Sequence, residues 1–320
     1  MSNKIIAKFC RFVILAVAVS VAVSSCGYAS SGDRRRPEFD ERASAYEKPE
    51  SVGQIKSAEI AESSGLAASA CQQDILWTHN DSGDGPYIFA IDASGANLGV
   101  WKVQNAENTD WEDMAAFKDG NGECHLFIGE IGNTEKAERT EHKIYRVREP
   151  VVDRRDGNAT RATAALTERA DVLIFRYGAA SHDAESLMVH PTTGDIYILT
   201  KHRSKPSSIY KLKADFGSGG TATAQKLGEL SVPGIPNGLL TGGSISPDGS
   251  RAVVCDYAAA YEITLPANGA NFDLIWQQRP VAVDLGSRKQ GEAISYSADG
   301  KSIFATSEKR GSPVIEVRRR

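Results

Sequence analysis

Two stretches of the chain share one pattern, and this pattern decides the fold: ISPDGSRAVVC over residues 245–255 and AISYSADGKSIFAT over residues 293–306. In each stretch, a short β-rich run leads into an Asp-Gly pair and then into a second such run. Asp and Gly supply the positive-φ positions of tight turns, so each stretch predicts a β-hairpin. A pattern that recurs along a chain indicates a fold built from repeats.

Further hairpins of this kind have their turns at Lys118-Asp119-Gly120, at Thr193-Gly194-Asp195 and at Cys71–Asp74. A third and a fourth β-rich run follow each hairpin, but the last hairpin lacks the fourth. The unassigned segment Val52–Ile60 can supply that strand and so close a ring without exposed edges. We therefore predict an all-β fold, a single propeller of five four-stranded blades over residues 51–320. A ring of six or seven blades would need a blade within residues 149–170, which we interpret as an insertion.

The first 25 residues are typical of an export signal. A basic start, with Lys4, Lys8 and Arg11, precedes the apolar run Val13–Val23, which is too short to span a bilayer as a helix. A small residue then precedes Cys26, which resembles the lipobox of bacterial lipoproteins. The resemblance implies cleavage before Cys26 and lipidation of that residue. The alternative is ordinary signal cleavage, with the cysteine there by coincidence.

Residues 26–50 are polar and charged, and they show no apolar period. This composition predicts a flexible tether between a lipid anchor and the folded domain. The expected location is the bacterial cell envelope, outside the cytoplasm. The formal net charge of −4 argues against nucleic acid as a partner, because phosphate binding needs a basic surface. We expect a monomer.

A polar residue precedes the first strand of each repeat. First strands line the central channel of a propeller, so equivalent positions at their starts converge on its axis. Converging carboxylates repel one another, and calcium, which takes six to eight oxygen ligands, would relieve this. The absence of His and Cys disfavours zinc and copper. The alternative is a channel in which waters bridge the side chains. The predicted metal ligands are Ser64, Glu112, Glu185, Ser244 and Glu292.

The order Ser, Glu, Glu, Ser, Glu around the ring resembles the soluble calcium-activated nucleotidases, which are five-bladed apyrases. The resemblance implies a central calcium ion beside a nucleotide site. The chain departs from that family at Trp111, which precedes Glu112 instead of following it. The segments WTHNDSGD (77–84), DWEDMA (110–115) and LFIGEIGN (126–133) also resemble a group of uncharacterised secreted bacterial propeller proteins. That resemblance implies fold and export, but no activity.

Loops that leave the second strands lie on the same face as the ring. They are acidic in the first two blades and basic in the third and fifth. The combination suits an anionic small molecule or an envelope polymer, and it suggests a metal-dependent hydrolase of phosphoesters, phosphoanhydrides or other esters. The alternatives are a non-catalytic binding propeller and a purely structural lipoprotein, with these loop residues merely solvated. The candidate catalytic residues are Asp81, Asp110 and His182 for water activation, and Lys201 and Arg203 for charge stabilisation.

Cysteines remain at three positions of the folded part. Cys71 and Cys124 both fall at turns between first and second strands, in neighbouring blades. Such turns can approach within the Cα separation of about 4.4–6.8 Å that a disulfide requires, so we predict a bond between them. The alternative is that both thiols are free. Cys255 lies inside a second strand and should be a buried free thiol.

Overall fold

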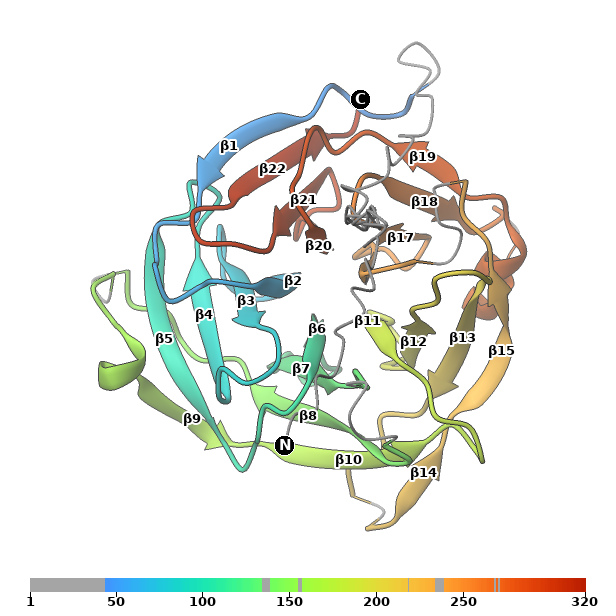
Figure 1. The fold of residues 1–320 in the computed structure, drawn as a ribbon, viewed down its shortest axis with the longest axis horizontal. Coiled ribbons are helices and arrows are strands. Elements are labelled where there is room, and N and C mark those ends of the chain that lie inside the picture. Colours follow the sequence, from blue (N-terminus) through green and yellow to red (C-terminus); the bar gives the residue numbers. More distant parts are fainter. Residues whose placement is uncertain are drawn as a thin grey trace, which may run out of the picture. The chain divides into compact units, whose positions relative to one another are not determined.

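The structure is a computed structural model that describes residues 44–133, 139–154, 157–217, 219–233, 239–267, 269 and 271–320. These residues form a five-bladed β-propeller, which confirms the predicted fold class (Figure 1). The predicted signal peptide, Cys26 and the predicted tether up to residue 43 lie outside the described residues. Within the described part, no helix is long and apolar enough to cross a membrane.

Each blade is a sheet of four antiparallel strands, which follow one another from the axis outward. The first blade contains β2 (Ser63–Ala68), β3 (Leu76–Asn80), β4 (Tyr87–Ile91) and β5 (Asn97–Gln104), and the second contains β6 (Trp111–Lys118), β7 (Cys124–Glu130), β8 (His142–Arg148) and β10 (Asp171–Arg176). The third contains β11 (Ala184–Val189), β12 (Ile196–Thr200), β13 (Ser207–Leu212) and β15 (Gln225–Leu230). The fourth contains β16 (Gly242–Ile245), β17 (Arg251–Cys255), β18 (Ala260–Thr264) and β19 (Val281–Val283), and the fifth contains β20 (Gly291–Tyr296), β21 (Ser302–Ser307), β22 (Pro313–Arg318) and β1 (Glu50–Gln54).

Central strands of the blades are buried on both faces, because each blade packs between two neighbours. Every residue of β12, with the sequence IYILT, is buried, and the same holds for β3 and β17. Strand β12 therefore reads as a short continuous apolar run instead of an alternating one. Large aromatic side chains fill the space between the first two blades, where Trp77, Trp111 and Tyr145 are almost fully buried. Burial of each such side chain adds on the order of 1.5–3 kcal/mol to the free energy of unfolding.

Strand β1 pairs antiparallel with β22 and forms the outer edge of the fifth blade. Contacts with the propeller begin before β1, because Tyr46 is 3% exposed and its hydroxyl donates a hydrogen bond to Glu262. The backbone also pairs at this point, with Glu47 N donating to Arg318 O at 2.8 Å. Residues 44–50, which the sequence placed in the tether, are thus part of the domain. One buried tyrosine and backbone pairing are enough to order a segment that lacks an apolar period.

Two short strands extend the blades beyond four. The insertion at residues 149–170 contains the 3-10 turn η1 (Arg161–Thr163) and β9 (Ala165–Arg169), which pairs in parallel with β5. Likewise, β14 (Thr221–Thr223) pairs in parallel with β10. The segment before the outer strand of the fourth blade forms the 3-10 helix η2 (Phe272–Gln277), which precedes β19. The insertion adds an edge strand to the first blade and does not form a blade of its own.

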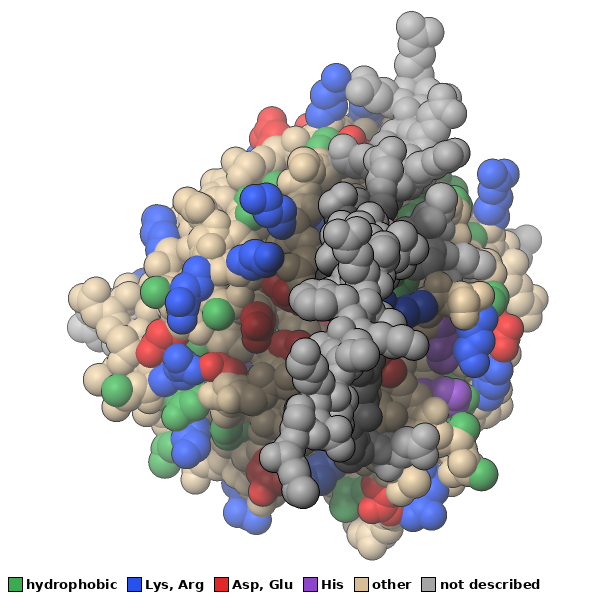
Figure 2. Space-filling model, viewed as in Figure 1, with side chains coloured by type: hydrophobic (Ala, Val, Ile, Leu, Met, Phe, Trp, Pro, Cys, Tyr) green, Lys and Arg blue, Asp and Glu red, His purple; other side chains and the backbone are tan. Residues whose placement is uncertain are grey.

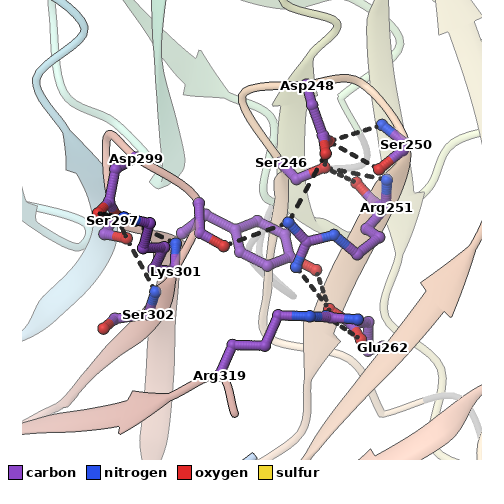
Figure 3. Close-up of polar contacts among 12 residues, drawn as sticks. Ser246, Asp248, Ser250, Arg251, Glu262, Ser297, Asp299, Lys301, Ser302 and Arg319 are labelled. Carbon is purple, nitrogen blue, oxygen red and sulfur yellow. Dashed lines mark hydrogen bonds and ion pairs between the residues drawn. The ribbon is translucent and has the colours of Figure 1, made fainter. Parts of the chain in front are cut away.

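The Asp-Gly turns that revealed the repeats share one hydrogen-bond pattern. Figure 3 shows Asp248 accepting from the hydroxyl of Ser246, and Asp299 accepting in the same way from Ser297, at 2.5 and 2.7 Å. The following glycines, Gly249 and Gly300, both have φ of +68°. The turn at Lys118-Asp119-Gly120 differs, because the positive φ of +86° falls at Gly122. That turn is longer than the sequence pattern indicated.

A disulfide joins Cys71 and Cys124, whose Cα atoms are 6.1 Å apart. The two cysteines lie at the strand-connecting turns of the first and second blades, so the bond links neighbouring blades on the face opposite the starts of the first strands. Cys255, in β17, is a buried free cysteine.

Candidate functional site

A β-bulge interrupts the start of the first strand in four blades. The pairing with the second strand shifts by one residue between Ser63 and Gly65, between Trp111 and Asp113, between Ala184 and Ser186, and between Gly291 and Ile294. A bulge carries one extra residue and redirects its side chain. The residues at the bulges are Ser64, Glu112, Glu185 and Glu292, which are four of the five predicted ring positions.

Ser244 does not belong to this ring. Strand β16 has no bulge, and its pairing runs without a shift from Gly242 opposite Cys255 to Ser244 opposite Val253. The position that matches the ring therefore falls at Gly242–Gly243, where no side chain is present. Ser244 lies further along the strand, and its hydroxyl accepts a hydrogen bond from Tyr296 N at 3.2 Å. The predicted ring position coincides with a bulge in four blades and not in the fourth blade.

Carboxylates converge at the bulged ends of β6 and β11. One carboxylate oxygen from each of Glu112, Asp183 and Glu185 lies within 4.8 Å of the other two. The same is true of one oxygen from each of Asp81, Asp110 and Glu112. The charge of Glu185 raises the pKa of Glu292, and so does the nearby Glu308. We call Asp81, Asp110, Glu112, Asp183, Glu185 and Glu292 the carboxylate cluster. Figure 2 shows acidic side chains toward the middle of one face of the propeller.

Four members of the carboxylate cluster are buried, Asp81 and Asp183 are partly buried, and the members repel one another. Burial raises the pKa of Glu112 well above its usual range, and the neighbouring Glu185 and Asp81 raise it further. Burial likewise raises the pKa values of Glu185 and Glu292. The more accessible Asp81 has its pKa raised to about 6, mainly by burial. These groups therefore favour either bound protons or a bound cation over the free ionised state.

The donors of the cluster fit a hard divalent cation. All of them are oxygen atoms, which suits calcium and disfavours zinc or copper. Among the described residues, Oε2 of Glu292 is buried and has no hydrogen-bond partner. A buried carboxylate oxygen can only accept, so it needs a donor or a cation. Ser64 differs, because its hydroxyl donates to the carbonyl oxygen of Glu112 at 2.6 Å and thereby joins two blades.

Two cationic side chains reach the cluster. Lys201 Nζ lies 2.6 Å from Glu185 Oε1, and the ammonium also lies 5.3 Å from the centre of the Tyr257 ring. Arg139 pairs with Glu130 and lies 3.7 Å from Asp110. Arg203, the other predicted stabiliser of negative charge, is exposed on the loop after β12. Its charge lowers the pKa of Asp183, against the upward effect of burial.

His182 belongs to a separate aromatic group. Its Nε2 lies 2.8 Å from the hydroxyl of Tyr210, and its ring packs edge-on against Tyr177. It takes part in neither carboxylate group of the described residues. Burial lowers its pKa, so the ring is neutral at pH 7. The structure thus brings Asp81 and Asp110 together with the ring residues, but it holds His182 in different surroundings.

Sequence reasoning did not assign a role to Asp183 or to Asp113. Asp183 precedes the bulge of β11, as Asp110 precedes that of β6, and this repeated spacing could have revealed it. Asp113 is fully buried, and its Oδ2 accepts hydrogen bonds from Leu187 N at 2.9 Å and Gly243 N at 3.1 Å. It therefore ties together the first strands of three blades. This is a structural role, because backbone amides already satisfy the carboxylate.

No family model and no curated protein matches the chain. Among solved structures, the chain is similar to one in the nidogen/laminin complex, with 16% identity, coverage of 77% of this chain and 73% of that chain, and a TM-score of 0.41. It is also similar to a luciferin-regenerating enzyme, with 12% identity, coverage of 83% and 94%, and a TM-score of 0.42. Neither likeness bears on the chemistry of the carboxylate cluster.

Proposed function

We propose that this protein is a lipid-anchored, extracytoplasmic propeller that binds calcium at the carboxylate cluster and hydrolyses an anionic ester there. Substrates of this kind are phosphoesters, phosphoanhydrides or other esters. The observation that supports the proposal is the convergence of buried carboxylates from several blades around Glu112. Such a concentration of negative charge is costly without a compensating cation. The calcium ligands in this proposal are Glu112, Asp183, Glu185 and Glu292, with Ser64 beside them.

The residues around the cluster have groups for each step of ester hydrolysis. A bound dication would polarise the ester oxygen and favour ionisation of a nearby water. Asp81, with a pKa of about 6, is mostly ionised at pH 7 and can accept the proton of an attacking water. Lys201 has two N–H groups beyond the one directed at Glu185, so it can donate to the developing negative charge. The exposed Arg203 would draw an anionic substrate toward this face.

A non-catalytic binding propeller is the second candidate function. The observation that favours it is the position of His182, whose ring nitrogen is engaged by Tyr210 instead of lying in the cluster. Under this alternative, the cation would bridge the cluster to a phosphate or carboxylate group of an envelope polymer, and no bond would break. We expect a monomer that does not bind nucleic acid in either case.

A paired assay tests the proposal. The purified mature chain is screened with aryl phosphates, nucleoside polyphosphates and carboxylic esters, with calcium and with chelator, and its melting temperature is measured in both. We expect calcium-dependent turnover of one substrate class, lost in Glu112→Gln and retained in Asp171→Asn, an exposed acidic control on the outer strand β10. Calcium-dependent melting without any turnover would favour the binding alternative. No effect of calcium on either readout would contradict the proposal.

A further inference from the structure

The end of the channel opposite the carboxylate cluster is a cavity of about 360 Å³, which we call the axial cavity. Residues from the first strands of all five blades line it, and four of these strands, β2, β6, β11 and β20, are labelled around the centre of the ring in Figure 1. We infer that the axial cavity binds a single-chain organic anion, a medium-chain fatty acid, with the carboxylate beside Lys118. The inference goes beyond the proposed function, because none of the lining residues belongs to the carboxylate cluster.

Asp113 separates the axial cavity from the carboxylate cluster. Its carboxylate, from the second blade, accepts from Leu187 N in the third blade and from Gly243 N in the fourth, at 2.9 and 3.1 Å, so the side chain reaches across the channel. Along β6, Glu112 precedes Asp113 and belongs to the cluster, whereas Met114 follows it and lines the cavity. A ligand in the axial cavity therefore does not depend on a cation at the cluster.

The axial cavity is deep and narrow. Its lining follows β6 from Met114 to Lys118, which gives a depth of about 13 Å at a rise of about 3.3 Å per residue. A volume of about 360 Å³ over that depth corresponds to a mean cross-section of roughly 28 Å². A tube of this width admits one hydrocarbon chain but no bulky fused ring. Its volume exceeds that of apolar cavities of about 150 Å³, which hold benzene.

Short apolar side chains form much of the wall. Ala68, Ala116 and Ile245 line the cavity and are only partly buried, so they expose apolar surface inside the channel. Met114 and Met188, which are two of the three methionines in the chain, lie at its closed end. Methionine side chains are flexible and polarisable, so they adapt to the shape of an apolar ligand. A hydrocarbon chain in the cavity would remove this apolar surface from water, which favours binding.

Hydroxyl groups on the wall are already hydrogen-bonded within the protein. Ser244 accepts from Tyr296 N at 3.2 Å, and Ser295 accepts from Ala68 N at 3.0 Å, so each satisfies a backbone amide of the next blade. The other hydroxyls of the lining donate to carboxylates, and they belong to Ser69, Tyr296 and Ser297. Few hydroxyls are therefore free to bind a polar ligand or ordered waters, and the body of the ligand should be apolar.

One available cation lies at the open end of the cavity. Lys118, the last residue of β6, is exposed and has no ion-pair or hydrogen-bond partner among the described residues. Asp119 is the other charged residue of the lining, and its Oδ1 accepts from Asn121 N and Glu123 N at 2.9 Å each. Its Oδ2 lies 3.6 Å from His125. The negative charge at the mouth is thus engaged within its turn, whereas the Lys118 ammonium can pair with the head group of an anionic chain.

Titration calorimetry with decanoate tests this inference. The purified mature chain, produced without a lipid group, is titrated below the micelle concentration of the ligand and at several temperatures. Decanol and decylamine have the same chain length with a neutral and a cationic head group. We expect one decanoate per chain and a negative heat-capacity change, which marks burial of apolar surface. Decanol should bind about threefold more weakly than decanoate, because it lacks the ion pair with Lys118, and decylamine more weakly still.

Three variants locate the bound chain. Ala116→Leu fills part of the cavity and should weaken decanoate binding about tenfold, because methylene groups of the ligand lose their place. Lys118→Gln changes an exposed side chain, so it should fold even if Ala116→Leu does not, and it should abolish the preference for decanoate over decanol. Lys301→Gln is the matched control, because Lys301 is an 82% exposed lysine at the corresponding turn of the fifth blade, outside the lining. It should leave both affinities unchanged.

The possible outcomes separate this inference from the proposed function. Glu112→Gln should bind decanoate as the native chain does, because the axial cavity lies beyond Asp113. Loss of binding in Glu112→Gln, with no effect of Ala116→Leu, would place decanoate at the carboxylate cluster and overturn the inference. Equal affinities for decanoate and decanol would overturn the pairing with Lys118. No binding of decanoate would refute the site and leave the proposed function intact.

Discussion

At the residue scale, the carboxylate cluster shows how burial converts ordinary acidic residues into a candidate site. Glu112, Glu185 and Glu292 are each less than a tenth exposed, and they face one another from different blades. Isolated on a surface, each would be a solvated charge with little influence on folding. Packed close together, they destabilise the folded state unless protons or cations are bound. Binding of a proton or cation there should therefore raise the free energy of unfolding.

Calcium should stabilise the protein through this cluster. At a concentration about 100-fold above the dissociation constant, a ligand specific for the folded state adds about 2.7 kcal/mol, which corresponds to a rise of roughly 5–10 °C in melting temperature for a domain of this size. Scanning calorimetry with calcium and with chelator measures the shift. Glu185→Ala should abolish it, whereas Asp171→Asn should retain it. An equal rise in Glu185→Ala and the native chain would show that calcium binds elsewhere.

His142 should make the protein sensitive to acid. Neither ring nitrogen of this buried residue has a hydrogen-bond partner among the described residues, and burial lowers its pKa to about 4. The folded state thus binds fewer protons than the unfolded state, whose histidine has a pKa of about 6.5. His142 therefore lowers the free energy of unfolding by about 3 kcal/mol as the pH falls from 6.5 toward 4, and it causes no such loss above pH 6.5.

Replacement of His142 by Phe tests this pH dependence. The side chain packs against Phe175 and Tyr177, so a phenyl ring suits its surroundings. Urea unfolding at pH 7, 5 and 4 should show a smaller loss of unfolding free energy in the variant than in the native chain. The same slope in both proteins would mean that other groups cause the sensitivity to acid.

At the scale of elements, the structure depends on links between neighbouring blades. The hydrogen bonds that define a blade are internal to its sheet, so other contacts must join one blade to the next. The added strands β9 and β14 each pair with the outer strand of the preceding blade, and side chains and a disulfide make further links. Asp113 links the first strands of blades two, three and four through backbone amides. The bond between Cys71 and Cys124 links blades one and two on the opposite face.

Loss of the disulfide should loosen the first two blades. The bond closes a loop with a sequence separation of 53 residues, so its removal should cost roughly 2–4 kcal/mol, mostly by freeing the unfolded chain. Cys71→Ser combined with Cys124→Ser should lower the melting temperature, and a reductant should have no further effect on that variant. An equal melting temperature for the native and doubly substituted chains would contradict a stabilising role.

At the scale of the whole molecule, the two ends of the domain meet in one blade. Strand β1 completes the sheet that contains β20, β21 and β22, and Tyr46, just before it, reaches Glu262 in the fourth blade. Glu262 also accepts from Arg251 at 3.3 Å and from Arg319 at 3.0 Å (Figure 3). The network therefore joins the N-terminal segment, the fourth blade and the C-terminal residues. The carboxylate of Glu262 thus adds to the pairing of β1 with β22 in holding the ends together.

Tyr46 should be important for this closure. Tyr46→Ala removes a buried ring and one partner of Glu262, so we expect a loss of about 3–5 kcal/mol, as for other buried aromatic residues. Tyr46→Phe keeps the ring, and it should cost only the hydrogen bond to a charged group, about 1.5–3 kcal/mol. Urea unfolding of both variants measures the two losses. Equal, negligible effects would show that the N-terminal segment is not needed for stability.

The proposed anchor acts on the whole molecule as well. Cys26→Ala removes the residue that would carry the lipid, so the protein should appear in the soluble fraction or keep its signal peptide. Fractionation of cells and mass spectrometry of the N-terminal peptide measure this, and the release of a correctly folded domain can be checked by its melting temperature. A variant that is cleaved normally and stays in the membrane fraction would contradict lipidation.

The sequence alone determined the five-bladed architecture, because hairpin turns and short apolar runs are local features that repeat along the chain. Acidic residues near the first strands were visible for the same reason. The membership of the carboxylate cluster was decided only by the tertiary structure. Four first strands contain a bulge and β16 does not, so the ring position of the fourth blade falls at Gly242–Gly243 and not at Ser244. Asp183 joins the cluster from just before β11. A shift of one residue reverses the direction of a side chain in a strand, and packing between blades, not local sequence, sets that shift.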